Sequence, residues 1–525
     1  MKKLSLLLTV LLFTCRLWAQ SPQSSGWTIT ANHIDPNNYY GLTVGNGMMG
    51  LVTSSNPLTV KDIVLNGVYD YYGRGRVSNI LKGFNFANMT LDVDGRRIGM
   101  NDISNYTQRL DMKAAVFTAQ FDVGKKVSVT YKLRALRELP FTSLIQLTIR
   151  ANQDVEVSPS NVIEAPDILR NVHNYYSEIS RPHALIPLLT SEGESPTGKH
   201  KVAASCSYLF SGIPQPKLIH EDWDHNRHLV RFVQKLKKGQ SFTFSVVGSE
   251  TSTAQYADPR NAAERLSIYA MLAGTDELIK RHDQQWDDLW KGDIKIEGNE
   301  QDQRDVRFSL YNLYSFVRAG SGYSLSPMGL SGLGYNGHVF WDTEIWMYPP
   351  LLMLHPEIAR SILDYRYNRL DAAKQNARSH GYKGAMFPWE SDDTGQEATP
   401  VWALSGPYEQ HISADIAIAA WNYYRVTHDK EWLRSKGYPI LKAVADFWIS
   451  RVEKGPDGKY NINNVVAADE WAENIDDDAF TNGAAIKALN DAASAAKVLD
   501  EQANPTWTEV AANIPILRFE NGTVK

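Results

Sequence analysis

The repeat of the apolar residues changes once along this chain, near residue 256, and this change constrains the fold more than any other feature. Before it, apolar and polar residues alternate, as in residues 117–123, which a Gly124-Lys125 turn separates from a second alternating run over 127–133. After it, apolar residues recur at helical spacing, as at Val306, Leu310 and Leu313. A period of two predicts strands and a period of 3.6 predicts helices. We therefore expect a β unit followed by an α unit.

Three folded segments follow from this pattern. Residues 27–255 are predicted to form an antiparallel β-sandwich domain, because short alternating runs are separated by turn residues without a helical repeat. Residues 256–300 predict a helical linker that starts at Asp258-Pro259. Residues 301–525 predict a helical domain with long connecting loops, and loops of that length in a compact domain commonly carry function.

The N-terminus has the pattern of a secretory signal peptide over residues 1–19. Two lysines precede an apolar run, and Ala19 ends a plausible cleavage site. After Ala19, no apolar run reaches the length of about 18 residues that a membrane span needs, so we expect a secreted or periplasmic protein without a membrane span. Cys206 is then the only cysteine of the mature chain, and its alternating surroundings predict a buried, structural thiol.

Composition and motifs argue against several other functions. The formal net charge of -5 gives no electrostatic case for nucleic acid as a partner. The stretch VGNGMMG, residues 44–50, fits G-x-G-x-x-G, but its surroundings predict strands, so we interpret its glycines as turn residues and not as a dinucleotide site. No H-E-x-x-H, C-x-x-C or Walker A motif occurs, and the run 476–478 lacks the spacing of an EF-hand loop. We therefore expect no metal and no cofactor.

Three expected loops of the helical domain pair a tryptophan with a carboxylate. These pairs are Trp341 with Asp342, Trp389 with Glu390, and Glu470 with Trp471. Indole rings suit the apolar faces of a sugar, and carboxylates accept hydrogen bonds from its hydroxyls. The recurrence of the pair on successive loops therefore indicates a carbohydrate site.

Simpler interpretations exist for two of these loops. Asp342 would also fit as the N-cap of the helix that follows it. The acidic stretch AADEWAENIDDDAFTN, residues 467–482, could by itself be a metal site or a solvated acidic face. Within it, we expect Asp476–Asp478 to cap a helix that starts near Ala479.

In their order along the chain, these segments resemble glycoside hydrolase family 65. The resemblance rests on VGNGMMG, GHVFWDTE, GAMFPWES, YEQHISADI and AADEWAENIDDDAFTN, and it covers residues 40–525. The family contains α-glucosidases and phosphorylases that act on α-linked glucosyl disaccharides. The resemblance implies an N-terminal β-sandwich, linker helices and an (α/α)6 barrel. Because too few helices are predicted over 301–525, we expect an incomplete barrel, cut short at the C-terminus.

The resemblance also assigns roles to the loop residues. It implies that Glu470 is the general acid, that Trp341 and Asp342 line the pocket for the non-reducing glucose, and that Trp389 and Glu390 line the same cleft. The acid motif here is Ala-Asp-Glu-Trp where the family commonly has Pro-Asp-Glu-Tyr, which leaves the subsite around Trp471 less defined.

For the acid itself, we expect a raised pKa. Burial against Trp471, together with repulsion from Asp469 or Glu473, would keep the Glu470 carboxyl protonated.

The implied function is that of an inverting glycoside hydrolase that releases glucose from short α-glucosides, with α-1,2-linked kojibiose as the leading substrate. The resemblance extends to glucosidases of glucosylgalactosyl-hydroxylysine. Export favours hydrolysis over phosphorolysis, but a disaccharide phosphorylase of the same family stays an alternative. The resemblance places the catalytic base beyond Lys525, so a further alternative is a non-catalytic, sugar-binding fragment. A homodimer is compatible with the sequence, which does not specify an assembly.

Overall fold

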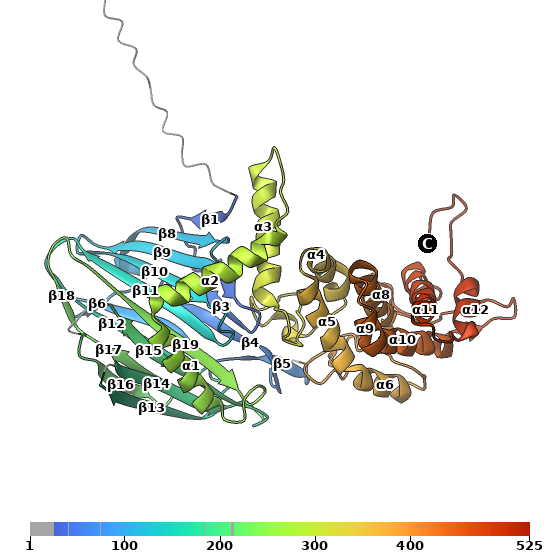
Figure 1. Ribbon diagram of the computed structural model, residues 1–525, viewed down its shortest axis with the longest axis horizontal. Coiled ribbons are helices and arrows are strands. Elements are labelled where there is room, and N and C mark those ends of the chain that lie inside the picture. Colours follow the sequence, from blue (N-terminus) through green and yellow to red (C-terminus); the bar gives the residue numbers. More distant parts are fainter. Residues whose placement is uncertain (1–25, 40, 74, 183, 212–214) are drawn as a thin grey trace, which may run out of the picture.

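The computed structural model describes residues 26–39, 41–73, 75–182, 184–211 and 215–525. The expected signal peptide, residues 1–19, lies outside the described residues. A β-rich domain and a helical domain lie at opposite ends of the long axis of the molecule (Figure 1). The structure therefore confirms the antiparallel β-rich N-terminal domain and the helical C-terminal region. The last strand of the β-rich domain ends at Ser252, and the first α-helix starts at Pro259.

The β-rich domain contains three antiparallel sheets. The first has nine strands, in the order β1 (Thr28–Ala31), β8 (Ile103–Asp111), β9 (Val116–Val123), β10 (Val127–Ala135), β11 (Thr142–Ala151), β19 (Ser241–Ser252), β15 (Lys201–Phe210), β14 (Ala184–Glu194) and β13 (Arg170–Arg181). The second has the order β16 (Ile219–Asp224), β17 (Arg227–Arg231), β12 (Val155–Glu164), β6 (Asn85–Val93) and β7 (Arg96–Arg97), and β18 (Gln234–Leu236) also pairs with β12. The third has the order β2 (Thr43–Gly45), β3 (Met49–Thr53), β4 (Val60–Tyr71) and β5 (Ser78–Lys82).

Local sequence explains the hairpins of these sheets. The predicted alternation over 117–133 forms β9 and β10, with Val123 opposite Val127 and the apolar side chains buried. At Asp94-Gly95 both residues have positive φ, 51° and 75°, which is the conformation of a tight two-residue hairpin between β6 and β7. The Cys206 side chain in β15 is buried, as predicted.

Two long helices follow the last strand. Asp258 caps α1 (Pro259–Ala273) by accepting a hydrogen bond from the Asn261 N–H, and Pro259 fits the first turn, where no donor is needed. The second helix, α2 (Thr275–Leu289), runs across the nine-stranded sheet toward α3 (Glu300–Phe316) (Figure 1).

The helical domain continues with α4 (Tyr348–Leu354), α5 (Pro356–Asn368), α6 (Leu370–Ser379), α7 (Ser405–Tyr408), α8 (His411–Thr427), α9 (Lys430–Trp432), α10 (Tyr438–Arg451), α11 (Ala479–Leu499) and α12 (Pro505–Asn513). The short strands β20 (Glu453–Lys454) and β21 (Tyr460–Asn461) form a hairpin after α10. Within the described residues, no helix is both long and apolar enough to cross a membrane. The completeness of the expected (α/α)6 barrel stays a prediction.

Two π-helical turns depart from the simple helices that the sequence predicts. They cover Thr343–Met347 before α4 and Leu433–Gly437 before α10. Each is followed by proline in the first turn of the next helix, and proline cannot donate the hydrogen bond of a regular α-helix. The first of these turns lies directly after Trp341 and Asp342.

The hairpin of β2 and β3 packs against the helical domain. The Gly47 N–H donates to the Ser315 carbonyl at 2.8 Å. A Cβ atom on Gly50 would lie 2.2 Å from the Leu330 carbonyl oxygen, and one on Gly45 would lie 2.7 Å from that of Ser315. The glycines of VGNGMMG are therefore required for close approach of two backbones. Gly47 lies in a turn, as predicted, whereas Gly45 and Gly50 lie in strands β2 and β3.

Candidate active site

The tryptophan-containing loops come together in an aromatic cluster. The Trp341 ring lies 6.3 Å from the Trp389 ring, 4.8 Å from the His411 ring and 5.6 Å from the Phe480 ring, measured between centroids. His411 begins α8 and Phe480 lies in the first turn of α11, so four separate segments meet here. Trp341 is half-buried, whereas Trp389 is only 3% exposed and packs behind it. Trp341 is thus the ring of this pair that a ligand can reach.

Asp342 does not act as a helix cap. Its backbone is already helical, and its side chain accepts no hydrogen bond from the following turn. Burial raises the pKa of Asp342. The carboxylate is therefore free to accept a hydrogen bond from a ligand hydroxyl, which removes the alternative interpretation of Asp342 as an N-cap.

Glu390 is held by a buried histidine. The carboxyl oxygen of Glu390 lies 2.7 Å from Nδ1 of His338, which is fully buried. On its other side, Nε2 of His338 lies 3.2 Å from Oγ of Ser78 in β5, and that hydroxyl donates to Asp392 at 2.6 Å. This chain of contacts fixes the orientation of the Glu390 carboxylate through a residue of the β-rich domain.

Glu397 organises the backbone beneath Trp389 and Glu390. Its carboxyl group accepts hydrogen bonds from the backbone N–H groups of Trp389 at 3.0 Å and of Glu390 at 3.3 Å, and from the hydroxyl of Thr399 at 2.7 Å. Burial raises the pKa of Glu397 to about 7, although these hydrogen bonds act in the opposite direction. The loop is thus folded around a carboxyl group, and Trp389 and Glu390 are placed by it.

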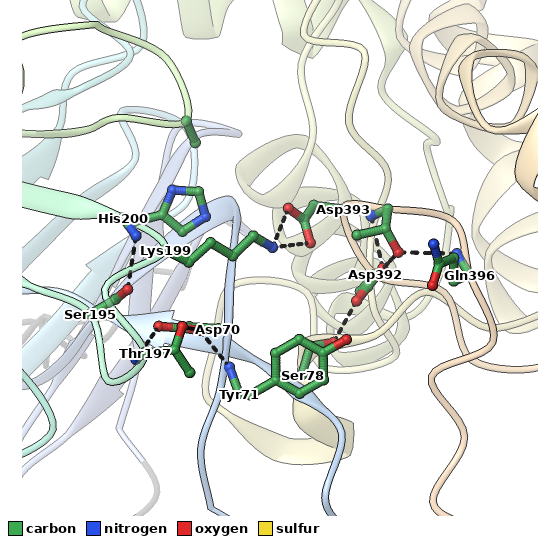
Figure 2. A network of polar contacts seen from close by, with 12 residues as sticks. Asp70, Tyr71, Ser78, Ser195, Thr197, Lys199, His200, Asp392, Asp393 and Gln396 are labelled. Carbon is green, nitrogen blue, oxygen red and sulfur yellow. Dashed lines mark hydrogen bonds and ion pairs between the residues drawn. The ribbon is translucent and has the colours of Figure 1, made fainter.

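The loop is also fastened to the β-rich domain beyond Glu390 (Figure 2). The Lys199 ammonium group donates to both carboxylate oxygens of Asp393, at 3.0 and 2.8 Å. Lys199 lies in the turn between β14 and β15, and Thr197 of the same turn donates its backbone N–H to Asp70 at 2.9 Å. The turn between β14 and β15, which is itself bonded to Asp70 of β4, therefore supports the segment that follows Glu390.

A buried carboxylate–histidine–carboxylate group lies under the aromatic cluster. Nδ1 of His411 lies 2.8 Å from Asp415, and Nε2 lies 3.1 Å from Glu409. Although burial lowers the pKa of His411, these two carboxylates raise it to about 9. Burial raises the pKa of Glu409 to about 7. The second carboxyl oxygen of Glu409 is buried without a partner among the described residues.

Glu470 lies on the loop that joins β21 to α11. Backbone hydrogen bonds between Val465 and Ile475 close the base of this loop, and Ala467 and Ala472 close its tip. The Glu470 side chain is exposed. Partial desolvation and then the charges of Asp342 and Glu390 raise its pKa, and His411 opposes them. The Glu470 carboxyl is therefore in the electrostatic field of the Asp342 and Glu390 carboxylates.

The expected cause of the raised Glu470 pKa was wrong in part. The Trp471 ring is 95% exposed and does not bury the carboxyl group, because the Asp469 side chain accepts the Trp471 N–H at 3.2 Å in a tight turn at the loop tip. The repulsion comes from Asp342 and Glu390, not from Asp469 or Glu473. Proximity in sequence suggested the wrong neighbours, since the loop brings Glu470 to side chains that are distant along the chain.

The run Asp476–Asp478 divides between two roles. Asp478 caps α11, as predicted, by accepting from the Thr481 N–H at 2.8 Å. Asp477 instead accepts from the Ile462 N–H at 3.0 Å, and Asp476 from the Asn464 N–H at 2.9 Å. Two of the three aspartates therefore close the loop that carries Glu470, residues 462–478, instead of capping the helix. We call this segment the acid-bearing loop.

Several residues of this cluster were not identified from the sequence. His338 and His411 lie inside the motifs GHVFWDTE and YEQHISADI, and a histidine near an aromatic residue and a carboxylate was a usable signal for a buried carboxylate partner. No local signal identifies Ser78 or Lys199, whose partners lie 314 and 194 residues away in sequence. Such contacts depend on how the two domains pack.

The cluster combines accessible indole, several carboxyl groups and an imidazole. These groups suit a neutral, polyhydroxylated ligand with an apolar face, and Glu470 can supply a proton. Among the described residues, three candidate metal ligands converge elsewhere, at His220, Asp222 and His228 of the β-rich domain.

Comparison with known proteins gives consistent matches. Residues 41–289 match the glycosyl hydrolase family 65 N-terminal domain, and residues 307–515 match the family 65 central catalytic domain. The chain is 53% identical over 521 residues to a kojibiose hydrolase of Mucilaginibacter mallensis, covering 99% of this chain and 76% of that protein. It is 50% identical over 511 residues to a kojibiose hydrolase of Flavobacterium johnsoniae, covering 97% of this chain and 74% of that protein.

A solved structure named as a kojibiose phosphorylase from the human microbiome superposes with a TM-score of 0.79, covering 94% of this chain and 71% of that chain. At 16% identity it supports the fold alone. The chain spans about three quarters of the length of the two kojibiose hydrolases.

Proposed function

The chain belongs to glycoside hydrolase family 65, and from this premise we propose that it is an inverting hydrolase that releases glucose from short α-glucosides, with kojibiose as the leading substrate. Two relatives at 53% and 50% identity are kojibiose hydrolases, which supports this choice of substrate. The proposal includes export through residues 1–19 to the periplasm or the medium.

The observation that carries the proposal is the placement of Glu470. Its exposed carboxyl group has a raised pKa in the field of Asp342 and Glu390, next to an aromatic cluster. A general acid in glycoside cleavage must hold a proton near neutral pH and must also exchange it with solvent. The raised pKa of Glu470 favours the first condition, and the exposure of its side chain meets the second.

The remaining residues take binding roles in this proposal. The face of Trp341 packs against the glucose ring, and Trp389 supports it from behind. Asp342 and Glu390 accept hydrogen bonds from glucose hydroxyls. Trp471, exposed at the tip of the acid-bearing loop, flanks the leaving sugar.

The reaction then follows the inverting scheme. Glu470 donates its proton to the glycosidic oxygen as the bond from that oxygen to the anomeric carbon breaks. A water molecule attacks the anomeric carbon from the opposite face and loses its proton to a second carboxylate, which in inverting enzymes lies about 6.5–9.5 Å from the acid. The α-glucoside therefore yields β-glucose, and the location of the base beyond Lys525 stays a prediction.

The test is glucose release from kojibiose by a protein extended beyond Lys525 through the expected catalytic base, followed by proton NMR of the anomer formed first. We expect β-glucose, without a requirement for phosphate. In Glu470→Gln we expect turnover to fall about 100- to 10,000-fold, the usual contribution of general acid catalysis, while kojibiose binding survives. Glu473→Gln removes an exposed carboxylate from the same loop and is the matched control.

Each other outcome favours a different function. Formation of β-glucose 1-phosphate only in the presence of phosphate would identify a phosphorylase. Kojibiose binding without release of glucose would favour the sugar-binding alternative. Equal activity of Glu470→Gln and Glu473→Gln would remove Glu470 from the role of acid.

A further inference from the structure

We propose that the β-rich domain carries a second site, a binding site for a divalent transition-metal ion such as Zn²⁺, formed by His220, Asp222 and His228. These three side chains each offer one ligand atom, and the three atoms lie within 4.8 Å of one another. The site lies in the β16–β17 hairpin, whereas the Trp341 cluster lies in the helical domain, so it does not depend on the proposed function.

The pairing of the two strands explains why the three side chains meet. In the antiparallel β16–β17 pair, Asp222 lies directly opposite His228. His220 precedes Asp222 by two positions on β16, so its side chain points to the same face of the strand. The hairpin therefore presents two imidazoles and one carboxylate on one face.

Hydrogen bonds fix the proton of His228 on the nitrogen that faces away from this group. The Asn174 amide donates to the carbonyl of His225 at 3.2 Å, so its oxygen faces Ser191. The Ser191 hydroxyl donates to that oxygen at 2.8 Å and can therefore only accept from Nε2 of His228, which lies 2.9 Å away. Nδ1 of His228 then carries no proton and presents its lone pair toward His220. An imidazole oriented through its second nitrogen in this way is characteristic of metal-binding histidines.

The separation of the nitrogen atoms matches a tetrahedral metal site. Nδ1 of His228 and Nε2 of His220 lie 3.3 Å apart. Two nitrogens at the usual Zn–N distance of about 2.0–2.1 Å, at a tetrahedral angle, are separated by about 3.3 Å. The His220 ring is held in place by parallel stacking on Tyr176, with centroids 4.8 Å apart and an interplanar angle of 6°.

Asp222 completes the set of ligands. Its carboxylate oxygen lies 3.6 Å from Nε2 of His220, and its side chain is 66% exposed. An exposed side chain can shift toward the ion without disturbing the core, and it gives the ion a path from solvent. Two imidazoles and a carboxylate are a donor set that Zn²⁺ accepts, with the fourth position left to water. No sequence motif predicted this site, because its ligands depend on strand pairing.

The test uses the full chain without a polyhistidine tag, titrated with Zn²⁺ against a chromogenic chelator. We expect one Zn²⁺ per chain and a higher melting temperature in the presence of Zn²⁺, since an ion that binds only the folded state stabilises it. His220→Gln and Asp222→Asn should abolish both effects. Ser191→Ala should weaken binding by about 10- to 100-fold, the usual effect of removing a partner of a metal-binding histidine.

The matched control is His225→Gln, which removes an exposed histidine from the turn of the same hairpin. It should bind Zn²⁺ as the unmodified chain does. His228 is left unchanged in these variants, since it is fully buried and its loss could unfold the hairpin. Failure of the unmodified chain to bind Zn²⁺ stoichiometrically would overturn the proposal and leave a direct hydrogen bond between His220 and His228. Equal binding by Asp222→Asn, His220→Gln and His225→Gln would also overturn it.

Discussion

The two loops that carry Glu390 and Glu470 are built in opposite ways. The first, residues 380–404, is folded inward: Glu390 is 8% exposed, is bonded to His338, and has its backbone N–H held by Glu397. The second, residues 462–478, is closed at its base, but Glu470 is exposed at its tip and has no hydrogen-bond partner among the described residues.

The difference corresponds to two chemical tasks. A carboxylate that recognises hydroxyl groups works best when its orientation is set before the ligand arrives, because less ordering is then needed on binding. A carboxyl group that gives up a proton in each turnover must regain one from water. The buried loop suits the first task and the exposed loop suits the second.

Replacing the tryptophan of each loop gives the largest expected contrast in stability. Trp389→Ala should lower the free energy of unfolding by about 3–5 kcal/mol, as for other buried aromatic residues. Trp471→Ala should change it by less than about 0.5 kcal/mol, because the ring is almost fully exposed. Denaturant unfolding of both variants measures this. Similar losses in the two variants would mean that the Trp471 ring is packed against the protein in solution.

Trp471→Ala should instead weaken the binding of a disaccharide about tenfold, or about 1.4 kcal/mol, with little effect on the binding of glucose. Calorimetric titration with both sugars separates these effects. Equal loss for glucose and kojibiose would place Trp471 outside the subsite for the leaving sugar.

Glu397→Gln tests how the inward loop is organised. The amide cannot accept all the hydrogen bonds that the carboxylate accepts, so we expect a loss of about 1–3 kcal/mol. The pKa of Glu397 is raised from 4.5 to about 7 in the folded protein, so the folded state binds the proton more tightly than the unfolded state. Its contribution to stability is therefore complete below pH 4.5 and is lost as the pH rises to 7.

Thermal unfolding of wild type and Glu397→Gln across this pH range measures whether the stability contributed by Glu397 falls or rises with pH. The stability advantage of the wild type should shrink toward pH 7. A constant difference, or one that grows with pH, would contradict the raised pKa.

The contact between the domains at Lys199 should have the smallest effect. The Lys199–Asp393 pair is partly exposed, with side chains 30% and 20% accessible, and such pairs contribute about 0–1 kcal/mol. Lys199→Ala, Asp393→Asn and the double variant form a thermodynamic cycle for this pair. A coupling energy well above about 1 kcal/mol would show that the β-rich domain holds the inward loop more strongly than a surface ion pair does.

The sequence predicted the framework of the fold and the acid–aromatic loops, but not how the loops are held. Periodicity located α3 and the β9–β10 hairpin, and capping residues located the starts of α1 and α11, because these signals act over a few residues. The Trp341–Trp389 contact agrees with the predicted shared cleft. The role of each residue in the site stays a prediction.

The sequence failed where distant segments meet. The carboxylates that raise the pKa of Glu470, Asp342 and Glu390, belong to other segments of the chain. Ser78, which donates to Asp392, belongs to the β-rich domain. Burial of Trp389 and exposure of Trp471 likewise depend on packing, since both residues stand beside a glutamate in sequence.

The glycine-containing hairpin of β2 and β3 affects whether the two domains can be produced as separate proteins. Cutting near residue 256 would separate Gly45, Gly47 and Gly50 from the Ser315 and Leu330 carbonyls that they approach. It would also release the Arg137 guanidinium, which donates to the Tyr314 carbonyl at 2.6 Å and is buried in that position. The two halves should therefore be produced together, because each supplies backbone partners that the other lacks.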